Sequence, residues 1–148
     1  MANSKRYFES VRNATERAAA LQDIADTSAE FAGAAKGMRY DRVQAGNQKN
    51  GYKHVDGLLE TVAKLDALSA RALDAREYAL AMVAEASEII ERVLEQPGAD
   101  VTSLDAVYSY YVLCKSDAQI AFDNDVDRSC IAHRRKRGLA KLEPYVPR

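Results

Sequence analysis

One uninterrupted stretch of this chain limits what it can fold into more than any other feature. No proline or glycine occurs between Gly57 and Glu95. Within it, small and aliphatic side chains recur every three, four or seven residues, which places them on one face of an α-helix. These are Leu58, Leu65, Leu68, Ala72, Ala75, Ala79, Met82, Ala86, Ile89 and Val93. We therefore expect a helix from about Asp56 to Glu95, roughly 60 Å long at about 1.5 Å per residue.

A second heptad pattern precedes this stretch, from about Asn3 or Ser4 to Ala32. Its members are Tyr7, Val11, Ala14, Ala18, Leu21, Ala25, Ser28 and Ala32. Four glycines punctuate the polar segment that follows and predict a loop over about 33–54. Residues 1–97 should therefore form a long antiparallel helical hairpin that resembles a coiled coil. Its alanine-rich seam buries little apolar surface for its length, so we expect a homodimer to add burial.

The composition agrees with an all-α protein, because the chain is rich in alanine and has no tryptophan, three prolines and seven glycines. No apolar run approaches the roughly 20 residues that a membrane span needs, and the first residues lack a signal-peptide core. The two cysteines, Cys114 and Cys130, form no CxxC pair and are too few for a metal site. We expect a cytoplasmic protein without membrane contact, metal or cofactor.

Shorter helices are predicted over residues 101–148, after a hinge at Gln96–Asp100. Thr102 or Ser103 should cap a helix at about 103–113, and Ser116 should cap another at about 117–123. Residues 124–126 form the expected turn, and Asp127 should cap a final helix at about 128–142. The residues expected to face inward are Ile120, Ala121, Ile131 and Leu139. Two helices joined by so short a turn are typical of a helix-turn-helix.

Charge is distributed unevenly along the chain. The whole sequence has 21 basic and 22 acidic residues, but residues 128–148 contain seven basic residues and one acid, Glu143. The first 127 residues therefore contain 14 basic and 21 acidic residues. A basic end on an acidic body indicates a nucleic-acid partner.

The C-terminal segment resembles the region-4 helix-turn-helix of bacterial sigma factors. The matching positions, without a gap, are Ser116, Gln119, Ile120, Ala121, Val126, Asp127, Ile131 and Gly138-Leu139-Ala140-Lys141-Leu142. With a long helical part in front, and the string Tyr40-Asp41-Arg42-Val43-Gln44, residues 38–142 are similar to phage and prophage regulators of the RinA/ArpU type. The pattern departs at Asn124, Asp125 and Arg134, where the family has a leucine, a glycine and an apolar residue. The resemblance implies control of the transcription of late phage genes by sequence-directed binding of double-stranded DNA.

In a helix-turn-helix the second helix enters the major groove. The sequence places Arg128, Ser129, Ala132, His133 and Lys136 on the outward face of that helix. Arg128 is the candidate for a bidentate contact with guanine. Lys115, Arg135 and Arg137 are expected nearer the phosphate backbone, with Ser116 at the start of the first helix.

No constellation of a base, a nucleophile and a pocket predicts an enzyme, and no phosphate-binding loop or HExxH motif occurs. Two other classes of function stay open. One is a phage packaging adaptor of the small-terminase kind, which should form a ring-sized oligomer. The other is a coiled-coil interaction protein with a diverged helix-turn-helix that docks on RNA polymerase or another protein.

Overall fold

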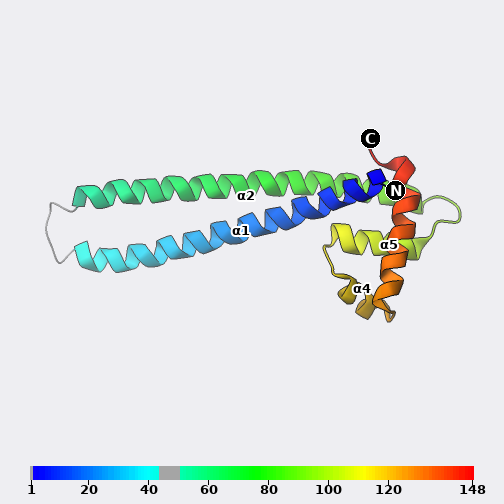
Figure 1. The fold of residues 1–148 in the computed structure, drawn as a ribbon. Coiled ribbons are helices and arrows are strands. Elements are labelled where there is room, and N and C mark those ends of the chain that lie inside the picture. Colours follow the sequence, from blue (N-terminus) through cyan, green and yellow to red (C-terminus); the bar gives the residue numbers. More distant parts are fainter. Residues whose placement is uncertain (1, 44–50) are drawn as a thin grey trace. The chain divides into compact units, whose positions relative to one another are not determined.

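The computed structural model describes the backbone of residues 2–43 and 51–148, without the side chains of residues 32, 34–43, 51–56 and 58. The helices, in chain order, are α1 (Ala2–Val43), α2 (Gly51–Leu94), α3 (Val101–Val107), the π-helical turn η1 (Tyr108–Val112), α4 (Asp117–Asn124), α5 (Arg128–Leu142) and the 3₁₀ turn η2 (Glu143–Tyr145) (Figure 1). The described residues include no strand, which confirms the all-α class. None of the described helices is long and apolar enough to cross a membrane.

Both long helices are longer than predicted, and the segment between them is correspondingly shorter. Helix α1 continues through Gly33 and Gly37 to Val43, and α2 begins at Gly51, so the loop predicted over 33–54 was too long. Glycine in a helix interior costs only about 0.5–1 kcal/mol relative to alanine, so two isolated glycines need not end a helix. Gln44 and Gly46 lie outside the described residues.

The chain divides into two compact units, and the division differs from the predicted boundary near residue 100. One, the end unit, comprises the residues up to Arg17 and Glu77–Arg148. The other, the hairpin unit, comprises Ala18–Arg76. The predicted C-terminal module is therefore not a unit of its own, because it shares the end unit with the first turns of α1 and the last turns of α2.

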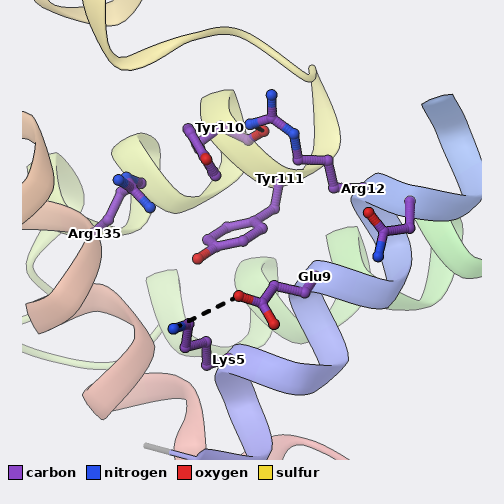
Figure 2. Close-up of a pocket in the computed structure, with 7 residues that line it drawn as sticks. Lys5, Glu9, Arg12, Tyr110, Tyr111 and Arg135 are labelled. Carbon is purple, nitrogen blue, oxygen red and sulfur yellow. Dashed lines mark hydrogen bonds and ion pairs between the residues drawn. The ribbon is translucent and has the colours of Figure 1, made fainter.

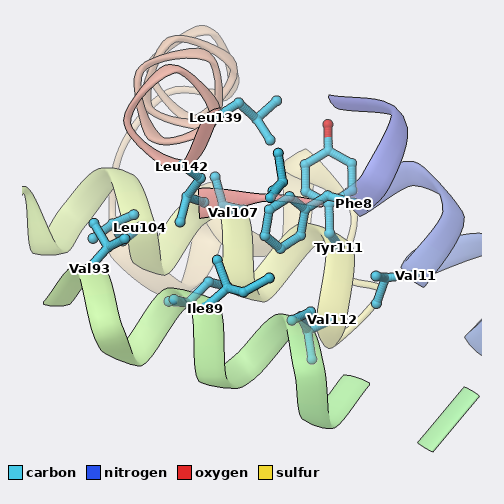
Figure 3. Packing of buried hydrophobic residues seen from close by; sticks show 13 residues of the cluster. Phe8, Val11, Ile89, Val93, Leu104, Val107, Tyr111, Val112, Leu139 and Leu142 are labelled. Carbon is cyan, nitrogen blue, oxygen red and sulfur yellow. The ribbon is translucent and has the colours of Figure 1, made fainter. Parts of the chain in front are cut away.

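The larger apolar cluster of the end unit is formed by residues of five helical elements together with Val146 (Figure 3). Its largest members are Phe8 and Val11 of α1, Ile89, Ile90 and Val93 of α2, Leu104 and Val107 of α3, Tyr111 and Val112 of η1, and Leu139 and Leu142 of α5. The inward orientation predicted for Ile89, Val93 and Leu139 is confirmed. This shared core explains why the two ends of the hairpin and the C-terminal helices form one unit.

The hairpin unit buries only small side chains among its described residues. Ala18, Ala25 and Ala72 are the apolar side chains that are buried there. Two larger members of the predicted stripe, Leu65 and Leu68, are only half-buried. The alanine-rich seam is therefore confirmed for these positions.

Long-range and local contacts both set the helix starts. The amides of Asn3 and Ser4 in the first turn of α1 donate to the two carboxylate oxygens of Glu143, at 3.2 and 2.9 Å. Helix α3 begins at Val101, two residues before the predicted start, because its cap is Asp100 and not Thr102 or Ser103. The Asp100 carboxylate accepts hydrogen bonds from the amide and the hydroxyl of Ser103, at 3.3 and 2.7 Å.

Candidate nucleic-acid interface

A capping box starts α4. The Ser116 hydroxyl accepts from the Gln119 amide at 3.2 Å, and the Gln119 side chain accepts from the Ser116 amide at 3.0 Å. These two bonds satisfy amides that the first helical turn leaves without partners. The predicted cap at Ser116 is confirmed, and the Ser116 side chain is committed to this role.

Asn124 and Asp125 depart from the sigma-factor pattern, and the conformation of the turn between α4 and α5 explains both residues. Asp125 adopts the left-handed conformation, with φ of 53°, which aspartate tolerates better than most residues. The exposed Asn124 donates its side-chain amide to the Ile120 carbonyl at 2.8 Å and so bonds the last turn of α4. Both residues therefore serve the turn itself.

The two helices pack through a small apolar cluster of their own. Ile120 and Ala121 of α4 meet Ile131 of α5, and these three side chains are 1, 5 and 0 % exposed. Val126 and Tyr110 pack against them. Asp127 is the N-cap residue of α5, as predicted, and is extended, but its side chain makes no capping hydrogen bond.

Helix α5 presents a continuous polar and basic face to solvent. Six of the predicted site residues are exposed on it, namely Arg128, Ser129, Ala132, His133, Lys136 and Arg137. Within the described part of the chain, no ion pair involves the charged side chains of this set. This face therefore carries positive charge that no acidic side chain pairs with among the described residues.

Arg135 lies elsewhere than predicted. It turns inward, where its guanidinium group pairs with Asp117 at 2.7 Å and its side chain is 19 % exposed. The same group lies over the Tyr110 ring, with the guanidinium carbon 3.8 Å from the ring centroid. Arg135 thus joins α5 to α4 and to η1, and it is not a free cation at the helix surface.

Tyr110 is placed between two arginines (Figure 2). The guanidinium carbon of Arg12 on α1 lies 4.0 Å from the ring centroid. Arg12 also donates to the carbonyls of Tyr110 and Lys115, at 3.1 and 3.4 Å. No local sequence signal indicates this arrangement, since Arg12 lies 98 residues before Tyr110 and Arg135 lies on a different helix after it.

A shallow pocket of about 390 Å³ opens beside this stack. It is lined by Lys5, Glu9, Arg12, Asn13, Tyr110, Tyr111 and Arg135 (Figure 2). Each of its cations already has an acidic partner, as Lys5 does with Glu9 at 3.7 Å. The lining is therefore electrically compensated, unlike the outward face of α5.

Two further site predictions concern the approach to α4. Lys115 is half-buried and pairs with Asp123 at 3.1 Å, while Ser116 is exposed beside it.

Both cysteines, Cys114 and Cys130, are half-buried and free. Burial raises the pKa of the Cys114 thiol, which disfavours the reactive thiolate form.

No family model, no curated protein and no solved structure matches the chain. Among the described residues, no group of three or more histidine, cysteine or acidic side chains could hold a metal ion. Any functional assignment therefore depends on the arrangement of α4 and α5.

Proposed function

We propose that this protein binds double-stranded DNA through α4 and α5 and acts as a transcriptional regulator of the phage or prophage type. The observation that carries the proposal is the uncompensated basic face of α5, next to a capped helix and a tight turn. A helix-turn-helix needs two helices held at a set angle and a second helix whose outer face is free to enter the major groove.

The side chains on that face match distinct parts of a duplex. Arg128, in the first turn of α5, is suited to the two acceptors of a guanine edge, because its planar fork donates two parallel hydrogen bonds. Ser129 and His133 lie on the same face and are suited to secondary contacts. Lys136 and Arg137 lie further along α5 and are suited to phosphates, which position a protein without selecting a sequence.

Lys115, Ser116 and Arg135 already make contacts within the protein, so fewer of the predicted residues are proposed to contact DNA directly. Arg135 fixes the orientation of α5 through Asp117 and Tyr110, and so acts on DNA binding only indirectly. The Ser116 and Gln119 amides are already bonded within the capping box, so Ser116 is not among the direct contacts. The direct contacts of the proposal are therefore those of the outward face of α5.

A salt titration of full-length protein on labelled duplexes, both randomised and prophage-derived, tests the proposal by fluorescence anisotropy. The variant Arg128→Ala/Lys136→Ala should bind at least about tenfold more weakly, and each lost phosphate contact should reduce the log–log salt slope by about 0.9. The control Arg17→Ala/Lys64→Ala removes the same charge from exposed positions of α1 and α2 and should bind like wild type. Equal losses in both variants would reduce the proposal to non-specific attraction.

A different class of function is favoured by one feature of α4. Phe122 is 87 % exposed, and such a side chain is suited to docking on another protein, RNA polymerase included. If wild-type protein bound no duplex even at low salt, this interaction role would replace DNA binding. A packaging adaptor would instead bind DNA as a ring-sized oligomer, which sedimentation mass distinguishes from a dimer.

A further inference from the structure

Helix α2 carries a second apolar stripe beside the one that faces α1. Its members follow the inner stripe by one residue and keep the same alternating spacing, so they share a neighbouring face. Leu59, Val62, Leu73 and Leu80 are 64, 37, 54 and 58 % exposed. Between them on this face lie Asp66, Ser69 and Arg76, all exposed. Four large aliphatic side chains aligned in solvent on one helix indicate a surface that another molecule covers.

We propose that this face of α2 packs antiparallel against the same face of a second copy of the chain, about a two-fold axis near Arg71. The register follows from the symmetry of the stripe around that residue. Val62 then faces Leu80 of the second copy, Asp66 faces Arg76, and Ser69 faces Leu73. In such an isologous contact every pair of facing residues occurs twice, so each favourable pair contributes twice to the stability of the dimer.

Charge selects this arrangement over the parallel one. Neither Asp66 nor Arg76 has an ion-pair partner among the residues that the structure describes. Antiparallel packing sets each beside its opposite, whereas parallel packing would set Asp66 against Asp66 and Arg76 against Arg76. Flanking charges of this kind determine partner orientation in helical assemblies.

Small side chains beside the stripe allow the two helices to approach closely. Ala63, Ala70 and Ala84 are exposed along its flank. From Val62 to Leu80 the contact extends about 27 Å, at about 1.5 Å per residue. A contact one helix wide and this long is small for a specific interface, so we expect a dimer that dissociates on dilution.

This inference does not depend on DNA binding, although a dimer would present two recognition helices to two half-sites. The test uses no DNA, so its failure is distinguishable from failure of the proposed function. Sedimentation equilibrium of the full-length protein over a range of concentrations should give twice the 16.3 kDa chain mass at high concentration. A wild-type protein that stays monomeric throughout would overturn the proposal, and so would a ring-sized mass.

Charge exchange tests the register itself. Asp66→Arg should raise the dimer dissociation constant at least about tenfold, because it sets like charges together on both sides of the axis. Arg76→Asp should do the same, and the double variant Asp66→Arg/Arg76→Asp should restore the wild-type constant. All these positions are exposed, so helix content by circular dichroism should not change. Failure of the double variant to restore association would rule out this pairing.

Substitution of one exposed aliphatic residue on each long helix tests whether the dimer contact lies on α2. Leu73→Asp, close to the axis, should abolish the dimer. Ile24→Asp places the same charge at a 50 % exposed aliphatic position of α1 and should leave the mass of the dimer unchanged. If Ile24→Asp and not Leu73→Asp prevented association, the contact would belong to α1 and the proposal would be wrong.

Discussion

The two units of this protein use the same secondary structure and bury different side chains. The end unit buries phenylalanine, leucine, isoleucine, valine and tyrosine, whereas the buried apolar residues described in the hairpin unit are alanines. Burial of a Val, Leu, Ile or Phe side chain contributes about 1.5–3 kcal/mol, and alanine has far less surface to bury. The comparison teaches that helix length does not measure stability, because the free energy of unfolding is concentrated where large side chains meet.

Polar contacts strengthen this contrast. In the end unit, Arg12 and Arg135 enclose the Tyr110 ring, and Glu143 accepts two amides of α1. Among the described residues of the hairpin unit, the side-chain hydrogen bonds are local, such as that between Gln22 and Asp26 on one helix. The end unit should therefore unfold last on heating.

Isoleucine truncation should give the largest difference between the two units. Ile131→Ala removes a side chain that is 0 % exposed between α4 and α5 and should lower the free energy of unfolding by about 2–5 kcal/mol. Ile24→Ala, at a 50 % exposed position of the hairpin unit, should change it by less than about 0.5 kcal/mol. Urea denaturation followed by circular dichroism measures both. Equal effects would mean that the hairpin unit has a core comparable to that of the end unit.

Glycine-to-alanine exchange should have opposite signs in the two units. A Cβ at Gly138 would lie 2.5 Å from the Ser103 carbonyl oxygen and 2.6 Å from a Val107 methyl group, so Gly138→Ala should cost about 1–3 kcal/mol by overpacking. A Cβ at Gly33 meets nothing within 4 Å, so Gly33→Ala should stabilise α1 by about 0.5–1 kcal/mol. Thermal denaturation reports both changes. Destabilisation by Gly33→Ala would show that α1 is not helical at that position.

Cap removal should give a smaller and pH-dependent effect. Asp100→Ala should cost about 1 kcal/mol at pH 7, while Asp127→Ala, at a position whose side chain makes no capping bond, should cost less. Hydrogen bonding from the Ser103 hydroxyl, followed by the Ser103 amide, the Thr102 hydroxyl and the charge of Lys141, lowers the pKa of Asp100 below its ordinary 3.8 although partial burial opposes it.

The sign of the pH dependence follows from that lowered pKa. The unfolded chain binds the proton more readily, so the stabilisation from Asp100 is complete above the unfolded pKa and is lost as the pH falls below it. Denaturation of wild type and Asp100→Ala between pH 6 and pH 2 should therefore show a difference that shrinks at the acid end. A difference that grew on acidification would contradict this account of the cap.

Much of the C-terminal arrangement could be predicted because its signals are local. The Ser116 cap is formed with a residue three positions away, and the turn at Asp125 depends on a single backbone conformation. The inward positions of Ile120, Ala121 and Ile131 follow from helical spacing. The long loop was mispredicted for a local reason too, since glycine disfavours a helix without excluding it.

The sequence by itself determined the all-α class, the two long helices, the cap and turn of the α4–α5 pair and the basic outward face of α5. Only the tertiary structure decided that Glu143 would bond the start of α1, that Gly138 would lie against Ser103, and that Arg135 would turn inward to Asp117 and Tyr110. The physical reason is the sequence separation of the residues in contact. Caps, turns and helical faces depend on residues within a few positions, whereas these contacts join segments that only the packing of the shared core brings together.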